Sequence, residues 1–283
     1  MHHQNLLALN SKLSLLSSKK RAQLVSYLPD HIQKTLGDKT FPEKSVPVAL
    51  TIEKLVRRID ISHFKAFLKT LSESEQQIYI FAFPKYKQSQ LCDEPVVFGE
   101  FRTEGFSNTV LNILFNKMLI GFPPPVYLPF HPIIEILGDT GITLAKLVNY
   151  LGLLDVAIEL KQIIAKKTLK KLQAVFDSEE LAFLHTAFNK ERLTSLSPMH
   201  LEGYNGDEKQ LREYILERGI YRFVQGVLKA PIEYLFFITY FLPVDIAEKI
   251  NSLLKNKYTL AADYSGFESD ILLTWRFLCT YSQ

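Results

Sequence analysis

Apolar residues recur at the spacing of an α-helix through the middle of the chain. Leu144, Leu147 and Leu151 lie at positions i, i+3 and i+7, so they share one face of a helix. Gly152 predicts the end of this helix, because glycine adopts the left-handed conformation that closes a helix without a steric penalty. A second helix is then expected over 153–164.

Two more amphipathic helices are predicted next. The third has an inward stripe of Leu169, Leu172 and Phe176 and an opposite face of Lys166, Lys167, Lys170 and Lys171. The fourth is expected to begin at Asp177 with a capping box to Glu180. Its expected buried stripe comprises Leu181, Leu184 and Phe188. Four short helices joined by tight turns form a compact array, which offers surfaces and has no cleft of its own.

Helical periodicity also dominates the rest of the sequence. Further helices are predicted over 47–58, 62–71, 72–83, 107–118 and 234–242, and in long segments that begin at 208 and near 267. Gly219 and Gly226 cost about 1 kcal/mol each inside a helix and indicate a bend or a close helix crossing. Only 95–101 has a strand-like pattern, so the sequence predicts an all-α fold with one short hairpin near 95–102.

Prolines are concentrated near the middle of the chain. Five of them lie within ten residues, at Pro123, Pro124, Pro125, Pro129 and Pro132. Proline fixes its own φ and restricts the residue before it, so this segment is expected to be extended and semi-rigid. The sequence therefore predicts an N-terminal helical lobe over 1–121, a proline-rich connector over 122–132 and a C-terminal helical lobe over 133–283.

The composition is typical of a folded protein and does not indicate nucleic acid as a partner. Of 283 residues, 47% are hydrophobic and 22% are charged. The net charge of +3 does not indicate a nucleic-acid-binding protein, because such proteins concentrate Lys and Arg on one face. Cys92 and Cys279 are too few for a disulfide scaffold and favour a reducing cytosol. The most apolar run, 234–242, is much shorter than the roughly 20 residues of a membrane-spanning helix.

The sequence does not predict a catalytic, cofactor-binding or metal-binding site. Its histidines are scattered, with no second histidine or carboxylate at the spacing of a known ligand pair. There is no phosphate-binding glycine loop and no nucleophile motif between a strand and a helix. The enzyme alternative is a helical enzyme with its site between the lobes, and it predicts a pocket lined by His185 or His131 with carboxylates in hydrogen-bond reach.

One region resembles a known family. The sequence LVNYLGL at 147–153, the helix at 157–164, LKKL at 169–172 and DSEEL at 177–181 together resemble the central region of the SctK/YscK family. Members of that family are cytosolic components of the type III secretion sorting platform. The resemblance implies a non-enzymatic adaptor at the inner face of the bacterial inner membrane. Its implied partners are the cytosolic domain of the membrane ring and the cytosolic pod protein.

The candidate interface has two parts. One is the leucine-glycine-leucine motif of Leu151, Gly152 and Leu153, and the other is the set Lys166, Lys167, Lys170 and Lys171. The simplest interpretation of the lysines is a solvated helix face. The functional interpretation is contact with an acidic partner surface or with anionic lipid headgroups of the inner membrane, since each lysine near such a membrane contributes about 1 kcal/mol.

A structural alternative comes from a repeated proline pattern. Leu28-Pro29 and Leu242-Pro243 are each followed by isoleucine and a further aliphatic residue at helical spacing. This pattern is similar to the helical hairpins of the flagellar rotor protein FliG. The alternative function is therefore a rotor-like helical scaffold, which is also non-enzymatic.

Overall fold

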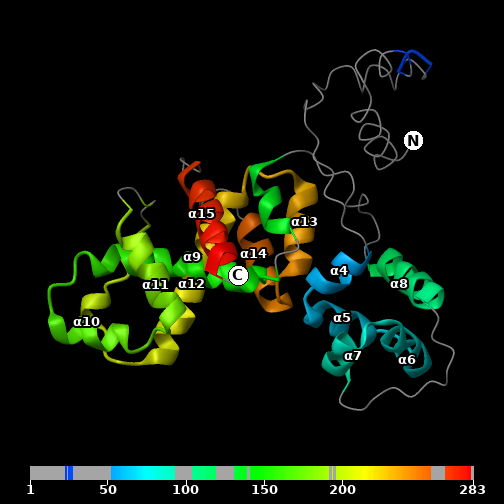
Figure 1. Cartoon of the computed structure of the whole chain (residues 1–283), viewed down its shortest axis with the longest axis horizontal. Coiled ribbons are helices and arrows are strands. Elements are labelled where there is room, and N and C mark those ends of the chain that lie inside the picture. The colour runs from blue at the N-terminus through cyan, green and yellow to red at the C-terminus, as the bar shows by residue number, and fades with distance from the viewer. Residues whose placement is uncertain are drawn as a thin grey trace. The chain divides into compact units, whose positions relative to one another are not determined.

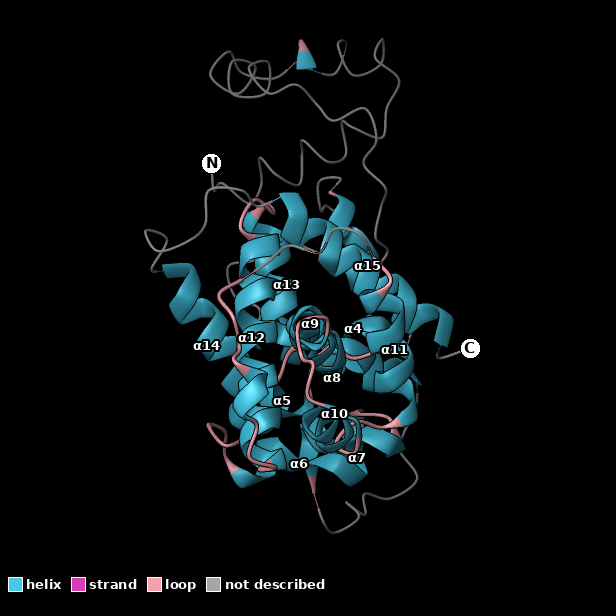
Figure 2. Cartoon of the chain, turned by 90° about the vertical axis from the view of Figure 1, so that its left-hand side faces the viewer, coloured by secondary structure: helices cyan, strands magenta, loops and turns pink. Residues whose placement is uncertain are grey.

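The computed structural model of the chain describes residues 23, 25–27, 52–92, 104–118, 131–138, 141–190, 193, 196–255 and 265–281. Within these ranges every regular element is a helix, and Figure 2 shows no strand among them. The all-α prediction is confirmed. The hairpin predicted near 95–102, the prolines at 123–129 and the Leu28-Pro29 motif lie outside the described residues.

The chain divides into two compact units, which are coloured along the sequence in Figure 1. The first comprises Met1–Ile134 together with Pro231–Phe236, and the second comprises Glu135–Ala230 together with Phe237–Gln283. The helix α13 (Ile232–Phe241) therefore begins in the first unit and ends in the second. Pro243 follows α13 and precedes α14 (Val244–Lys255), so the Leu242-Pro243 motif joins two helices as its pattern predicts.

The first unit packs short helices around phenylalanine rings. Its helices are α4 (Ile52–Arg58), α5 (Ile61–Leu68), α6 (Glu73–Ala82), α7 (Lys85–Leu91) and α8 (Glu104–Met118). The ring of Phe64 meets the rings of Phe83 and Phe115 edge-to-face, at centroid distances of 4.8 and 6.2 Å. Beside them, Lys87 Nζ donates a hydrogen bond of 3.2 Å to the carbonyl oxygen of Ile59. Burial lowers the pKa of this lysine.

The second unit is built around α9 (Leu144–Leu160). Its other elements are the 3-10 helices η2 (Pro132–Leu137, shared with the first unit) and η3 (Leu201–Gly203) and the α-helices α10 (Lys166–Gln173), α11 (Ser178–Phe188), α12 (Glu208–Val227), α14 and α15 (Ser265–Tyr281). Helices α11, α12 and α15 all pack against α9, which Figure 2 shows nearly end-on. Leucines on every side of α9 are fully buried, because neighbouring helices surround it.

The prediction that Gly152 ends a helix is wrong. Gly152 lies inside α9, which continues to Leu160. A Cβ atom at Gly152 would lie 1.9 Å from the carbonyl oxygen of Ile215 on α12, and a Cβ atom at Gly219 on α12 would lie 1.9 Å from the carbonyl oxygen of Val148. The two glycines therefore let the backbones of α9 and α12 approach more closely than any larger residue would permit.

The close-crossing interpretation of Gly219 and Gly226 is confirmed. Gly226 faces α15, where an added Cβ atom would lie 2.9 Å from the carbonyl oxygen of Phe267 and 2.4 Å from Cδ1 of Ile271. Both glycines lie within the continuous helix α12, so neither marks a break. Helix α12 is thus fitted against α9 at one glycine and against α15 at another.

The predicted helix over 153–164 and the buried stripe predicted for 181–188 both need correction. Helix α9 ends at Leu160, so the turn that follows buries Ile163 and leaves the side chain of Ile164 92% exposed. The capping box of Asp177 and Glu180 forms as predicted. Helix α11 buries Phe183, Leu184 and Ala187, however, and exposes Leu181 and Phe188 to 37% and 44%. The periodicity identified the helix correctly, but the predicted inward face differs from the observed one by about one residue, or about 100° around the helix axis.

The glycine crossing predicts a large effect from one methyl group. We expect Gly152→Ala or Gly219→Ala to lower the free energy of unfolding by about 1–3 kcal/mol, because a methyl group placed against a carbonyl oxygen forces the helices apart. Urea unfolding can be followed through the fluorescence of Trp275, the single tryptophan, which is 2% exposed on α15 of the same unit.

Gly203→Ala is the matched control, because an added Cβ atom at Gly203 has no atom within 4 Å. It is expected to leave the unfolding midpoint nearly unchanged. Equal midpoints for Gly152→Ala, Gly219→Ala and Gly203→Ala would contradict the close-contact role.

Candidate functional site

A buried ionic network lies at the junction of α9, α12 and α15. The carboxylate of Asp155 on α9 accepts hydrogen bonds from the guanidinium groups of both Arg222 and Arg218 on α12, the latter at 2.7 Å from Nε. Arg222 Nη1 also donates at 2.9 Å to the carboxylate of Asp270 on α15. The network therefore connects three helices through charged groups.

The charges of this network balance one another. Arg222 is fully buried, and Asp155 and Asp270 are 3% and 6% exposed. A buried unpaired charge would cost several kcal/mol, so two guanidinium groups facing two carboxylates is the arrangement that desolvation permits. The guanidinium carbon of Arg222 also lies 5.7 Å from the ring centroid of Phe267. These contacts leave the network well suited to fixing the geometry of three helices.

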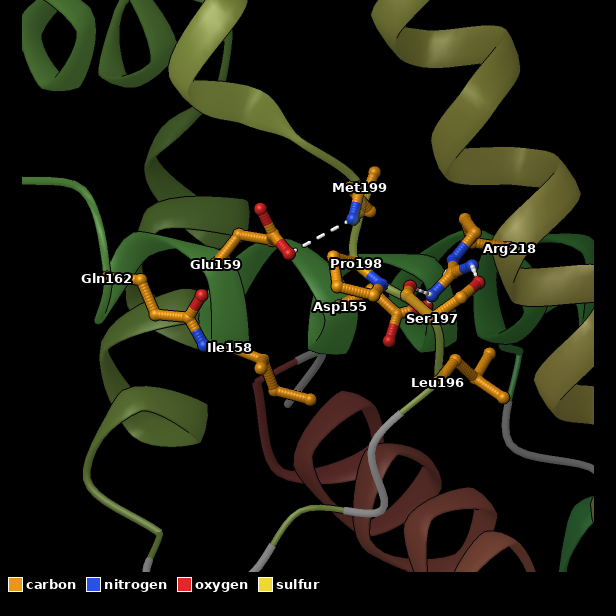
Figure 3. A pocket seen from close by; sticks show the side chains of 9 residues that line it. All are labelled: Asp155, Ile158, Glu159, Gln162, Leu196, Ser197, Pro198, Met199 and Arg218. Atoms are coloured by element: carbon orange, nitrogen blue, oxygen red, sulfur yellow. Dashed lines mark hydrogen bonds and ion pairs between the residues drawn. The ribbon is translucent and has the colours of Figure 1, made fainter.

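The same network holds the segment that leads into α12, as Figure 3 shows. Glu159, one turn beyond Asp155, accepts hydrogen bonds from the backbone N–H groups of Met199 at 3.0 Å and Leu201 at 3.4 Å. Arg218 donates from Nη1 to Oγ of Ser197 at 3.0 Å and from Nη2 to its carbonyl oxygen. The segment 196–201 is therefore fixed to α9 and α12 from both sides.

A small hollow lies beneath this segment (Figure 3). Its lining residues are Asp155, Ile158, Glu159, Gln162, Leu196, Ser197, Pro198, Met199 and Arg218. Its volume is about 30 Å³, enough for one or two water molecules and much smaller than the roughly 300 Å³ of a small-molecule site. The charged groups around it, on Asp155, Glu159 and Arg218, already bond to one another, to Ser197 or to the backbone. We therefore assign the hollow a structural role.

The two histidines of the enzyme alternative do not line this hollow. His185 is exposed on α11, and its Nδ1 lies 3.4 Å from the side-chain nitrogen of Asn189. His131 is half-buried in the first unit, where its Nδ1 accepts a hydrogen bond from the N–H of Ile133 and its ring lies 5.8 Å from that of Tyr234. Among the residues that the structure describes, no group of three or more His, Cys, Asp or Glu side chains could hold a metal ion.

The four predicted lysines form one exposed surface on α10, which we call the basic face: Lys166, Lys167, Lys170 and Lys171. On the opposite side of α10 Leu172 is fully buried, and Phe176 just beyond the helix is 6% exposed. Arg212 of α12 fixes this end of the unit. Its guanidinium pairs with Glu180 at 2.5 Å, donates to the carbonyl oxygen of Val175 and lies over the ring of Phe176.

The other part of the predicted interface lies in the core. Leu151 and Leu153 have no exposed surface, and Gly152 is buried against α12. In this fold these three residues present no surface to a partner. The leucine-glycine-leucine motif serves the crossing of α9 and α12, because its glycine admits the backbone of α12.

Sequence reasoning missed the ionic network. One signal was available, since Asp155 interrupts the apolar run LGLLDVAIEL, and a charge inside such a run is expected to be buried and paired. Its partner Arg222 is 67 residues further along the chain, and Asp270 is 48 residues beyond that. No local spacing rule connects positions so far apart.

The network predicts unequal effects for its two arginines. We expect Arg222→Met to lower the free energy of unfolding by about 3–5 kcal/mol, because Asp270 and Asp155 stay buried without their shared cation. Arg218→Met is expected to cost roughly 1–2 kcal/mol, since Asp155 keeps Arg222 and the position is partly exposed. Urea unfolding monitored at Trp275 measures both variants. A smaller loss for Arg222→Met than for Arg218→Met would contradict this order.

Comparisons with known proteins give no match: no protein-family model, no curated protein and no solved structure resembles the chain closely enough to be counted. A search of the described helices for a membrane span also gives a negative result, since none combines the necessary length and apolar character. The basic face on α10 and the ionic network at the junction of α9, α12 and α15 are therefore the features on which a functional proposal depends.

Proposed function

We propose that this protein is a non-enzymatic adaptor that binds an anionic surface through the basic face of α10. The observation that carries the proposal is the charge of the segment 161–176. It contains Lys161 and the four lysines of the basic face, all exposed, and it contains no acidic residue. The sequence as a whole has nearly equal numbers of acidic and basic residues, so this segment has a local excess of positive charge.

The basic face costs the helix energy when nothing binds it. Lys166 lies four residues before Lys170, and Lys167 lies four residues before Lys171, so two like-charged pairs repel by a few tenths of a kcal/mol each. Lys166 and Lys167 also occupy the first turn, where the helix dipole disfavours cations, and Ala165 provides no side-chain cap. An anionic partner surface would offset these terms. Exposed charges of this kind mainly raise the rate at which a partner associates, and they make the affinity depend on salt concentration.

The helix is held on a rigid support, which suits an adaptor. Leu172 anchors α10 in the core, and Arg212 ties the turn after it to α12 and α11. Because α12 is in turn fixed to α9 by the glycine crossing and the Arg222 network, the position of the basic face is set by the whole unit. A preorganised surface loses little entropy when a partner binds.

The resemblance of 147–181 to the SctK/YscK family suggests the setting of this adaptor. We place it at the cytosolic face of the bacterial inner membrane, in a type III secretion sorting platform. Its partners there would be the cytosolic domain of the membrane ring and the pod protein. A rotor-like scaffold is the alternative setting, and it has one motif in the described residues, the α13–Pro243–α14 connection.

Replacing the basic face tests the proposal. We expect the variant with Lys166, Lys167, Lys170 and Lys171 all changed to glutamine to bind the recombinant ring domain or pod protein about thirtyfold more weakly at low salt. Four exposed cations at roughly 0.5 kcal/mol each give this factor. We also expect a smaller salt dependence of the dissociation constant. Association can be measured by biolayer interferometry at low and high salt, with helicity and melting checked by circular dichroism.

A second quadruple variant serves as the control. It changes four exposed lysines to glutamine and so removes the same charge elsewhere: Lys65 of α5, Lys69 directly after α5, and Lys249 and Lys255 of α14. This variant is expected to bind as the unaltered protein does. Equal weakening in both variants would mean that net charge alone drives association, and no weakening in either would refute the adaptor role of α10.

A further inference from the structure

Beside the basic face, the turn between α9 and α10 projects an apolar side chain into solvent. Ile164 is 92% exposed, the highest value among the large hydrophobic residues that the structure describes. Its neighbour Ile163 is 6% exposed, so this turn buries one isoleucine and presents the other. A lone exposed hydrophobic residue needs no explanation by itself. Ile164 is of interest because it lies between Lys161 and Lys166, so an exposed apolar side chain has cationic neighbours in the sequence.

The surroundings of Ile164 combine apolar and cationic groups. Lys161, at the start of the turn, lies with Nζ 5.4 Å from the ring centroid of Phe188, which is 44% exposed. The same Nζ donates to the carbonyl oxygen of Lys190 at 3.0 Å. After Ile164 come Ala165, also exposed, and the first lysines of the basic face. The turn therefore carries an apolar tip with cations on both sides in the sequence.

We infer that this turn and the basic face dock on an anionic lipid surface, with Ile164 entering the interface and the lysines at the headgroups. The inference rests on the proposed function, because it identifies the anionic surface that the basic face would bind. Lysine suits such a site, since its long alkyl stem can lie along apolar material while its ammonium group stays with the phosphates. The absence of acidic residues from 161–176 removes repulsion from the headgroups.

Two features favour lipid over a protein surface. The cores of protein–protein interfaces are depleted in lysine and contain several apolar residues packed together, whereas here five exposed lysines lie within seven residues of one isoleucine that is 92% exposed. A projecting tip also has no groove in which a partner side chain could be held. A planar anionic surface needs neither feature, because the apolar residue enters the interface and the cations spread over the headgroups.

Binding by this turn is expected to be weak, reversible and sensitive to salt. One apolar side chain and a polybasic segment together give only peripheral attachment, well below that of a spanning helix. Each lysine near an anionic membrane contributes about a fivefold change in affinity. Raising the salt concentration to several hundred millimolar should then release the protein.

Vesicle binding of the full chain tests the inference. The probes are vesicles of phosphatidylcholine alone and of phosphatidylcholine mixed with phosphatidylglycerol, analysed by co-sedimentation at low and high salt. We expect binding to the mixed vesicles only, with a loss of about tenfold for Ile164→Ser because the apolar contribution is removed. Ile113→Ser, at a 47% exposed position on α8, is the matched control and is expected to bind normally.

A fluorescence measurement reports insertion directly. Ile164→Trp is expected to shift its emission to shorter wavelength on mixed vesicles, whereas Ile113→Trp is expected not to shift. The single native tryptophan, Trp275, is 2% exposed and contributes a constant background. An absent shift for Ile164→Trp, or equal vesicle binding of Ile164→Ser and the unaltered protein, would overturn insertion.

The lysine variants separate this inference from the adaptor proposal. Loss of vesicle binding in the basic-face variant, with normal binding in the Lys65, Lys69, Lys249 and Lys255 variant, supports lipid docking. No binding of the unaltered protein to mixed vesicles, together with lysine-dependent binding to the ring domain or pod protein, would overturn lipid docking and leave the adaptor role standing. Vesicle binding of the unaltered protein, without lysine-dependent binding to the ring domain or pod protein, would refute the adaptor proposal and leave lipid docking standing.

Discussion

The approach of α9 to α12 is the contact on which the second unit depends. It is nearly symmetric, since Gly152 faces the carbonyl group of Ile215 and Gly219 faces that of Val148, each carbonyl four residues before the opposite glycine. Asp155 and Arg222 each lie three residues after their glycine, so they fall on the same side of the crossing and meet there. A wider separation of the backbones would break this buried ion pair, and Arg222 would keep only Asp270.

The ionic network extends this crossing to the rest of the unit. Arg222 reaches Asp270 on α15, and Arg218 and Glu159 hold the segment 196–201 that leads into α12. Buried ion pairs are often no more stabilising than well-packed apolar groups, so their value here is in specifying which helix faces meet. A unit fixed in this way can present α10 in a constant position, even though α10 itself has few packing contacts beyond Leu172 and Phe176.

Helix α10 differs from the rest of the unit in how its residues are used. Its one buried leucine and the Arg212 contacts hold it, while its lysines repel one another and the two in its first turn oppose the helix dipole. Elsewhere in the second unit several exposed or half-buried charges are paired, as at Lys146 with Glu179 or Arg276 with Glu135. The segment 161–176 has five lysines and no acidic residue, and it also contains the exposed Ile164. Both functional proposals are based on this combination.

The sequence by itself determined the helical class, the capping box at Asp177, and the exposed side of α10. These features follow from interactions within about one turn of helix, which local spacing records. The role of Gly152 depended on tertiary structure, because glycine is equally suited to a helix end and to a close crossing, and its partner Gly219 lies 67 residues away. Tertiary structure also determined the pairing of Asp155 with Arg222, because it set which helix packs against α9. It determined the exposure of Ile164 as well, because α9 ends at Leu160.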